Sequence, residues 1–332
     1  MQAKIKACEE QPETHHCENY FGTRPKIIEP ASIELKRRAG TMSEAQPVCR
    51  AHPPSSTATP LDLSGIDVMI TNRVSDEAHS KPPGSDPIEV TIIVPCYNEA
   101  DGLLHLREKL VSAAFNLEPA YAASFLLVDD GSTDGTWELM QGLFANRPRW
   151  TLIRHPANRG IGAAIWTGIR AANTEIVCSI DADCSYDPCQ LDKLIPRLGP
   201  GVALVTASPY HPAGAVIGVS RRRVFLSKVA SFLYRKILRQ KLYTYTSCFR
   251  VYRRSSILRL SLWRHDFLAI PELVGKLDLK SAVVVECPAA LTARAYGGSK
   301  MKTLGVLLRH LHLMTELLGL RISQTLFADS GT

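Results

Sequence analysis

The chain has 332 residues, of which 45% are hydrophobic, and this is enough for one large domain or two ordinary ones with a sizeable core. The formal net charge is +7, and the positive residues are unevenly spread along the chain. The N-terminus lacks the apolar run of a secretory signal, and no 18 apolar residues follow one another, so we expect neither a signal peptide nor a membrane-spanning helix.

The first part of the chain differs from the rest. Residues 1–86 contain the run PPSSTATP and show no sustained apolar periodicity, which predicts a mostly disordered extension. From Glu89 to Thr206, short apolar runs alternate with stretches of helical periodicity. The expected strands cover 89–95, 124–128, 151–155, 175–180 and 202–206, and the expected helices cover 100–115, 135–145, 160–172 and 188–198. This alternation is typical of an α/β domain with a mostly parallel central sheet and helices on both faces, which we place at 87–300.

The order of elements changes after Thr206. A long basic helix is predicted over 221–240, an extended segment over 248–252, a helix over 267–276 and a last strand from Ser281. Residues 302–321 carry leucines and a methionine at helical spacing with charged residues between them, which predicts an amphipathic helix in the C-terminal segment 301–332. Such a helix suits a membrane surface or packing on the α/β domain or a partner subunit, and the sequence leaves these open.

Two acidic clusters, 129–130 and 181–183, each follow a predicted buried strand. An ionised Asp cannot stay unpaired inside such a layer, so we expect the acids at the carboxyl edge of the sheet, where open α/β sheets bind ligands. Carboxylates two residues apart suit Mg²⁺ or Mn²⁺, cations that often keep substrate phosphates as further ligands. The clusters therefore indicate a site for a nucleotide diphosphate. A helix cap or turn is the alternative interpretation, and we assign it to Asp134.

The basic residues point to a second anion. Between Lys193 and Arg264 there is no Asp or Glu, although many Arg and Lys residues fall in this range. A phosphate or a membrane surface is the expected partner of such a face. Nucleic acid is not expected, because no helix-turn-helix, RNP or zinc-finger pattern is present.

Four motifs carry a resemblance: IIVPCYNEADGL at 92–103, LLVDDGSTDGT at 126–136, HPANRGIGAAIWTGIRAA at 155–172 and SIDADCSYDP at 179–188. Together they resemble the family 2 glycosyltransferases, and within them the dolichyl-phosphate mannose synthase-like group, over roughly residues 88–300. The resemblance implies a GT-A fold, a divalent cation (Mg²⁺ or Mn²⁺) and inversion at the anomeric carbon. It also implies a nucleotide-sugar donor of the GDP-mannose or UDP-glucose type and a polyprenyl phosphate acceptor.

The resemblance also implies roles for individual residues. The nucleotide-binding residues would be Pro95, Tyr97, Glu99, Asp129, Asp130 and Ala182. Asp181 and Asp183 would bind the metal, and Arg294 would contact the diphosphate or the acceptor phosphate. The other residues expected at the acceptor phosphate are Arg223, Ser227, Arg250, Ser299 and Lys300. The chain departs from the group at Ser185, where a Gln often completes the metal shell.

Two other functions remain open from the sequence. One is transfer to a glycan or small-molecule hydroxyl, for which Glu272 or Asp266 would act as the catalytic base. The other is a non-catalytic protein that binds a nucleotide sugar. For the leading interpretation we expect a cytoplasmic enzyme of cell-envelope or glycan biosynthesis, peripheral at the cytoplasmic face of the membrane. The nine scattered cysteines suit reduced thiols there, and Cys184 and Cys189 lack zinc-ligand spacing.

Overall fold

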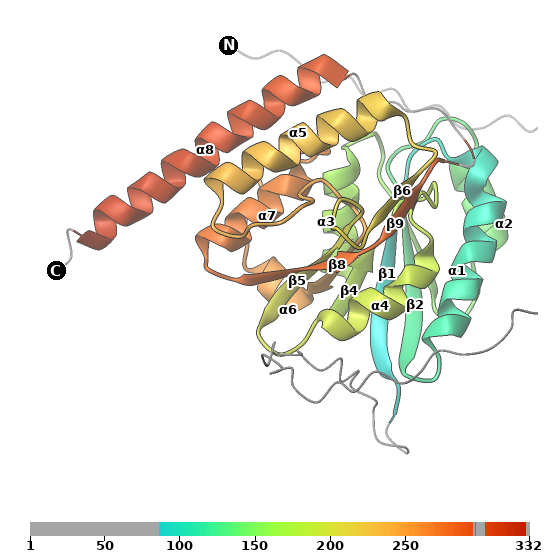
Figure 1. The fold of residues 1–332 in the computed structure, drawn as a ribbon. Helices are drawn as coiled ribbons and strands as arrows, with labels where there is room; N and C mark the ends of the chain where they lie inside the picture. The colour runs from blue at the N-terminus through green and yellow to red at the C-terminus, as the bar shows by residue number, and fades with distance from the viewer. Residues whose placement is uncertain (1–85, 295, 297–302, 330–332) are drawn as a thin grey trace, which may run out of the picture. The chain divides into compact units, whose positions relative to one another are not determined.

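The computed structural model describes residues 86–294, 296 and 303–329, with the side chains of the last range described at 305 and 307–324. The main sheet consists of β1 (Ile88–Cys96), β2 (Tyr121–Asp129), β3 (Trp150–Arg154), β4 (Ile176–Ser179), β5 (Val202–Ser208), β7 (Arg250–Arg253) and β8 (Val283–Pro288). Their order across the sheet is β3-β2-β1-β4-β7-β5-β8 (Figure 1). Strand β7 is antiparallel to both of its neighbours, and the other pairings in this sheet are parallel. The prediction of a mostly parallel α/β sheet is confirmed.

The second half of the domain contains features that the sequence pattern did not predict. The extended segment expected at 248–252 supplies β7, which is inserted between β4 and β5. A hydrogen bond of 2.8 Å between the hydroxyls of Ser179 and Tyr252 links β7 to β4. Strands β6 (Ala215–Ile217) and β9 (Ala290–Thr292) form a separate two-stranded parallel sheet. They bring the polar loop after β5 next to the segment that follows β8.

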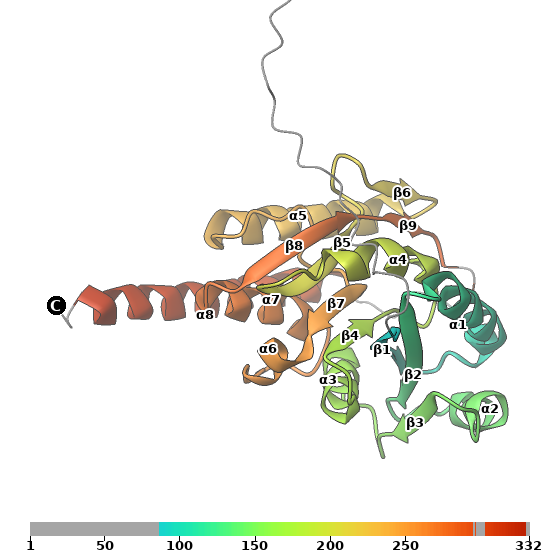
Figure 2. The same ribbon diagram turned by 90° about the horizontal axis from the view of Figure 1, so that it is seen from below.

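Helices cover both faces of the main sheet (Figure 2). They are α1 (Leu103–Leu117), α2 (Thr136–Phe144), α3 (Ile161–Ala171), α4 (Leu191–Leu194), α5 (Arg221–Ile237), α6 (Arg254–Leu258), α7 (Ala269–Leu279) and α8 (Thr303–Asp329). One apolar core contains residues of α1, α2 and α4, and the other contains residues of α3, α5, α7 and α8. The helix predicted over 188–198 is divided, with a 3₁₀ turn before the short α4 and another after it. The second turn contains Pro196, which has no N–H for a continuous helical ladder.

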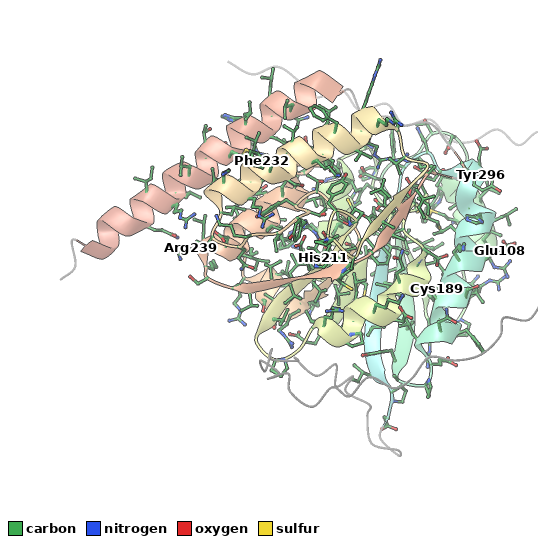
Figure 3. All side chains as sticks on the ribbon, in the orientation of Figure 1. Glu108, Cys189, His211, Phe232, Arg239 and Tyr296 are labelled. Atoms are coloured by element: carbon green, nitrogen blue, oxygen red, sulfur yellow. The ribbon has the colours of Figure 1, made fainter. Side chains whose placement is uncertain are left out.

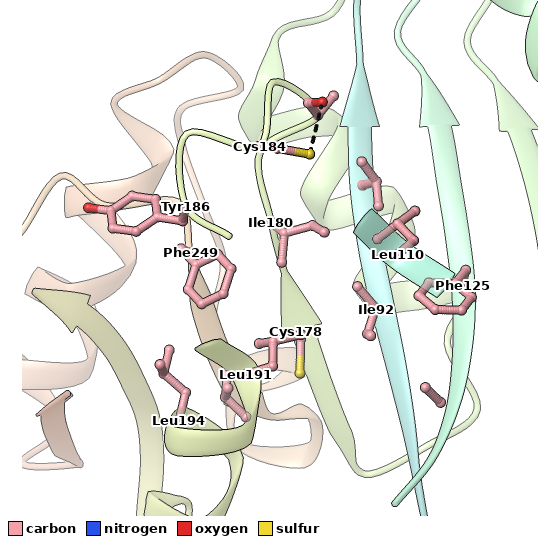
Figure 4. Packing of buried hydrophobic residues seen from close by; sticks show 14 of the residues in the cluster. Ile92, Leu110, Phe125, Cys178, Ile180, Cys184, Tyr186, Leu191, Leu194 and Phe249 are labelled. Atoms are coloured by element: carbon pink, nitrogen blue, oxygen red, sulfur yellow. Dashed lines mark hydrogen bonds between the residues drawn. The ribbon is translucent and has the colours of Figure 1, made fainter. Parts of the chain in front are cut away.

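The core beside α1 and α4 shows why the strands are apolar on both faces. Ile92, Phe125 and Cys178 come from three neighbouring strands and pack with Leu110 of α1 and Leu191 of α4 (Figure 4). Because helices lie on both sides of the sheet, side chains that alternate along a strand are buried in either direction. Polar groups consequently gather where the strands end.

Helix α8 packs on the domain through one of its faces. Leu313, Met314 and Leu317 are buried in the core that also contains α7 residues. Leu317 lies so close to Gly275 of α7 that a Cβ there would be 2.4 Å from Leu317 Cδ1. His310 is hydrogen-bonded to the Tyr234 hydroxyl of α5 at 3.0 Å. Helix α8 thus lies within the C-terminal segment for which an amphipathic helix was predicted. Within the described ranges no helix has the length and apolarity needed to cross a bilayer.

Candidate active site

The ends of β1, β2 and β4 meet at a cavity of about 240 Å³, which we call the acid cavity. The parallel register brings these ends together, because Cys96 of β1 pairs with Asp129 of β2 and Ile93 pairs with Ser179 of β4. Nine of the residues predicted from the sequence line the acid cavity: Pro95, Tyr97, Glu99, Asp130, Asp181, Ala182, Asp183, Arg223 and Arg294. The remaining lining residues are Cys96, Asn158, Ile161, Ala164 and Phe267.

The two acids after β2 have different surroundings. Asp129 lies opposite Arg154 in the β2–β3 register, and its Oδ2 atom is 3.1 Å from the Arg154 Nε atom. Its other oxygen accepts a hydrogen bond from the Ser132 N–H at 3.2 Å. Asp129 is fully buried and is not part of the cavity wall. The structure therefore brings Asp130, but not Asp129, to the wall of the acid cavity.

Asp130 holds the loop that begins α3. Its carboxylate accepts hydrogen bonds from the N–H groups of Arg159, at 3.0 Å, and Gly160, at 2.7 Å. His155 Nδ1 lies 2.6 Å from the same carboxylate and, since an ionised carboxylate has no proton to give, donates to it. The other ring nitrogen of His155 is 2.9 Å from the Thr167 hydroxyl of α3. These bonds fix the edge of the acid cavity that contains Asn158 and Asp130.

Glycine makes this arrangement possible at two positions. Gly131, directly after Asp130, has φ of +73°, and a Cβ there would lie 2.4 Å from the carbonyl carbon of Ala157. Gly160 has φ of +97°, and its Cβ would be 2.7 Å from the backbone oxygen of His265. Positive φ and such close backbone approach both favour glycine. The loops that surround the site can therefore pack directly on one another.

The acid pair after β4 lies on the wall with two arginines. The pKa of Asp181 is raised to about 7, first because its carboxyl is removed from water and second because Asp183 is close by. Arg223 and Arg294 act in the opposite direction. Asp183 accepts a hydrogen bond from the Ser185 N–H at 2.9 Å, and its other oxygen is 2.6 Å from the Arg294 Nε atom.

The donor set at this pair fits a hard divalent cation. Two carboxylates that repel each other in a poorly solvated place are stabilised by added positive charge. Across the part of the chain that the structure describes, no group of three or more His, Cys, Asp or Glu side chains could hold a metal ion. The protein would thus supply two oxygen ligands through Asp181 and Asp183, and phosphate oxygens and water would supply the rest, as is usual for Mg²⁺.

A second cavity, of about 390 Å³, adjoins the acid cavity and is called the α5 cavity here. The two share Asp181, Arg223 and Phe267 on their walls. Ser227 of α5 lines the second cavity and is hydrogen-bonded to the Thr246 hydroxyl at 2.9 Å. Arg223 lies in the first turn of α5, where the Ser220 side chain caps the helix by accepting a hydrogen bond from the Arg223 N–H.

Besides Asp129, two further predicted site residues lie away from both cavities. Arg250 is fully buried in β7 and donates to the backbone oxygens of Ile270, at 2.7 Å, and Tyr245, at 2.8 Å. Glu272 is fully buried in α7 and accepts from the N–H groups of Trp263, at 2.6 Å, and Arg264, at 2.8 Å. Neither residue lines the acid cavity or the α5 cavity.

Glu272 is also 2.6 Å from Lys276 Nζ, which lies over the Trp263 ring. Asp266, the other candidate base, forms an ion pair with Arg309 of α8 and accepts from the Leu268 N–H at 3.0 Å. Both acids therefore bind neighbouring protein groups. Ser299 and Lys300 lie outside the described residues.

Several cavity residues were not predicted from the sequence. Phe267 lies on the wall that the two cavities share, and Leu307 and His310 bring α8 into the lining of the α5 cavity. Thr244, Thr246 and Ser247 add hydroxyl groups to the same lining. The run YTYTS at 243–247 is dense in hydroxyls within the acid-free stretch, and this signal could have identified them. Phe267 and the two α8 residues have no comparable sequence signal.

Comparison with known proteins identifies the family. The family described as "Glycosyl transferase family 2" matches residues 91–260 of the chain. The chain is 30% identical over 231 residues to the polyprenol monophosphomannose synthase of Mycolicibacterium smegmatis, covering 66% of this chain and 85% of that protein. The chain belongs to glycosyl transferase family 2. This family 2 glycosyltransferase falls in the dolichyl-phosphate mannose synthase-like group, as predicted.

Two further curated relatives support this placement. The dolichol-phosphate mannosyltransferase of Pyrococcus furiosus is 29% identical to the glycosyltransferase, over 69% of this chain and 64% of that protein. The undecaprenyl-phosphate 4-deoxy-4-formamido-L-arabinose transferase of Proteus mirabilis is 27% identical, over 69% of this chain and 67% of that protein.

Solved structures support the fold. A glucosyl-3-phosphoglycerate synthase from Mycobacterium tuberculosis, crystallised with Mn²⁺, uridine diphosphate and glucosyl-3-phosphoglycerate, matches with a TM-score of 0.53 and 18% identity. The match covers 70% of this chain and 80% of that one. The family 2 glycosyltransferase therefore has the GT-A fold that was predicted.

Proposed function

We propose that this glycosyltransferase transfers a hexose, mannose or glucose, from a nucleotide diphosphate sugar to a polyprenyl phosphate, with inversion at the anomeric carbon. One observation carries the proposal: the acid cavity and the α5 cavity meet at Asp181, Arg223 and Phe267. A donor diphosphate at the acid pair and a second phosphate beside α5 would be neighbours. The dolichol phosphate and undecaprenyl phosphate in the names of two relatives support this acceptor, and the Mn²⁺- and UDP-bound neighbour supports this class of donor.

The residues would divide the reaction between them. Asp181 and Asp183 would hold Mg²⁺ or Mn²⁺, which when bound neutralises the charge that develops on the leaving diphosphate. Arg223, on the wall common to both cavities, would bind and orient the acceptor phosphate, a task for which guanidinium geometry is suited. A phosphate monoester has a second pKa of about 6, so most of the acceptor is already ionised at neutral pH and needs no general base.

The contacts of the other predicted residues favour structural roles. The carboxylate of Glu272 is engaged by two N–H groups and by Lys276, so we propose that it stabilises the start of α7. Arg250 is engaged by two backbone oxygens, and we propose that it anchors β7 to α7. We likewise propose that Asp129 joins β2 to β3 through Arg154. Nucleoside contact would then fall to Pro95, Tyr97, Glu99, Asp130 and Ala182.

The acceptor is tested by following radiolabel from GDP-mannose and UDP-glucose in the presence of polyprenyl phosphate and Mn²⁺. Label in the organic phase supports the proposal, and label confined to water-soluble products supports a hydroxyl acceptor. Bound donor without any transfer supports a non-catalytic protein.

A pair of variants on α5 tests the role of Arg223. Arg223→Gln should raise the KM for polyprenyl phosphate by about tenfold or more, the value of one charge-assisted phosphate contact, and should change the donor KM little. Arg221→Gln, assayed with the acceptor in detergent rather than in vesicles, is the matched control, because Arg221 is exposed on the same turn of α5 and does not line either cavity. Equal effects of the two substitutions on the acceptor KM would contradict the assignment.

We further propose that α5 and α8 make the peripheral membrane contact. The two helices lie side by side (Figure 1) and are joined by the Tyr234–His310 hydrogen bond. Helix α5 carries Phe225 and Phe232, which are 67% and 57% exposed to solvent; Phe232 is labelled in Figure 3. Exposed cations of α5 surround these rings: Arg221, Arg222, Lys228 and Lys236. Helix α8 exposes Leu308, Leu311 and Leu318. Aromatic and aliphatic side chains among cations suit an anionic lipid interface.

Vesicle sedimentation tests this contact. The protein should bind vesicles that contain phosphatidylglycerol more than vesicles of phosphatidylcholine alone, and added salt should weaken the binding. Replacing both Phe225 and Phe232 by Ser should reduce the bound fraction severalfold, as expected when buried apolar area is lost from an interfacial helix. Phe115→Ser on α1, where the ring is 78% exposed, is the control. Binding that does not depend on lipid charge or on the two α5 rings would refute the assignment.

A further inference from the structure

Arg294 contacts one of the two acids that we assign to the cation. Its Nε atom is 2.6 Å from Asp183 Oδ2, and the Asp183 side chain is only 5% exposed. The other oxygen of Asp183 accepts the Ser185 N–H. One oxygen is thus held by the backbone of its own loop, and the other is held by a side chain that follows β9.

The Arg294 contact is of a kind that can be exchanged. The Nε atom is buried and close to Asp183 Oδ2, but the N–H does not point at this oxygen well enough to form a hydrogen bond. The contact is therefore an ion pair and lacks the two parallel hydrogen bonds of a bidentate guanidinium–carboxylate pair. The Arg294 side chain keeps 26% of its surface exposed. It also lines the acid cavity, so a modest change of rotamer leaves it beside any phosphate bound there.

A divalent cation and Arg294 compete for the same oxygen. Mg²⁺ binds carboxylate oxygens at about 2.0–2.1 Å, and a guanidinium nitrogen that stays 2.6 Å from that oxygen would face the cation across a very short distance. Like charges so close repel strongly where little water screens them. The cation can therefore share Asp183 Oδ2 only after Arg294 has moved away.

We propose that Arg294 is a surrogate cation: it neutralises Asp183 until a divalent cation binds, and the cation then displaces its guanidinium onto a phosphate in the acid cavity. The inference rests on the proposed function, because it takes Asp181 and Asp183 as the cation ligands. Its consequence is a coupling between two ligands. When no nucleotide is present, the ion pair weakens the binding of the cation. Once the cation is bound, the released guanidinium strengthens the binding of a nucleotide diphosphate. By linkage, the nucleotide must strengthen cation binding by the same factor.

Mn²⁺ affinity, measured by electron paramagnetic resonance of the free ion with the full chain, tests the proposal without any turnover. Arg294→Gln should bind Mn²⁺ alone about tenfold more tightly than the wild type, a factor within the usual range of coupling between sites. In wild-type protein, GDP or UDP should raise Mn²⁺ affinity, and in Arg294→Gln this gain should shrink severalfold. Arg294→Lys keeps a competing charge and should stay nearer the wild type.

Two controls separate the possible causes. Arg223→Gln removes a cation from the same cavity wall without removing the Asp183 ion pair, so it reports the general electrostatic gain. The surrogate-cation proposal is wrong if Arg294→Gln binds Mn²⁺ no more tightly than Arg223→Gln. It is also wrong if GDP or UDP raises the Mn²⁺ affinity of Arg294→Gln as much as that of the wild type. If Asp183→Asn binds Mn²⁺ as well as the wild type, the proposed cation site itself is wrong. If neither the wild type nor Arg294→Gln binds Mn²⁺, both proposals fail.

Discussion

The carboxylate of Asp130 offers a quantitative test of how the site is built. It is 2% exposed and accepts from three donors: Arg159 N, Gly160 N and His155 Nδ1. In Asp130→Asn, the amide oxygen can take the place of Oδ1 and keep the bonds from Arg159 and His155. The amide NH₂ then occupies the place of Oδ2, where it faces the Gly160 N–H, so two donors oppose each other.

The magnitude of the effect is set by the bonds that are lost. A hydrogen bond to a charged acceptor contributes about 1.5–3 kcal/mol, and the two bonds that remain lose their charge assistance. We expect Asp130→Asn to lower the free energy of unfolding by about 2–3 kcal/mol. For a domain of this size, this corresponds to a decrease in Tm of roughly 5–10 °C. Because Asn158 and Asp130 share the cavity wall, nucleotide affinity should fall as well.

Differential scanning fluorimetry, combined with urea unfolding for the free energy, measures the effect. The control is Glu138→Gln, which also converts a carboxylate to an amide but at a side chain that is 68% exposed. It should lower the free energy of unfolding by less than about 0.5 kcal/mol. If Asp130→Asn unfolds within about 1 °C of the control, the carboxylate does not organise the loop as the hydrogen bonds indicate.

Three other predictions concern packing and charge. Leu317→Ala should lower the free energy of unfolding, measured by thermal unfolding, by about 2–5 kcal/mol, because Leu317 packs on α7 and is only 1% exposed. Leu318→Ala, at a side chain that is 41% exposed, should leave the stability nearly unchanged. Burial and the adjacent Arg309 lower the pKa of His310 from 6.5 to about 4. The free energy of unfolding should therefore decrease by about 3 kcal/mol as the pH falls from 6.5 to 4. In His310→Gln, urea unfolding at a series of pH values should show a smaller decrease over this range. Glu272→Gln should lower stability by about 3–5 kcal/mol and leave kcat of the folded enzyme unchanged; a loss of kcat at full stability would restore Glu272 as a base.

Local pattern predicted the first half of the domain well. Between Ile88 and Ser208, strands and helices alternate as the runs of apolar residues indicate, because each strand is buried on both faces and each connection is short. The second half depends on long-range pairing. The residues of β7 read as an extended segment, but its antiparallel place between β4 and β5 is decided by neighbours far away in the sequence.

The partners of charged residues, like the place of β7, could not be predicted from the local sequence. Arg250 lies in a basic stretch, and its sequence context favours a phosphate contact. Folding instead places it at 0% exposure with two carbonyl oxygens as partners. Glu272 is similarly surrounded by N–H groups and Lys276. A buried charge needs partners, and those partners come from segments whose approach a local pattern does not reveal.

The sequence by itself determined that acids stand at the ends of two buried strands and that a cation and phosphates suit them, because an unpaired carboxylate cannot remain in an apolar layer. Only the tertiary structure decided which groups surround each of those acids. Strand register places Arg154 beside Asp129 and so leaves Asp130 for the cavity wall. The packing of β9 beside the loop after β4 brings Arg294 onto Asp183. Charge can be read along a chain, but the partner of each charge is set by which segments the fold brings within a few ångströms.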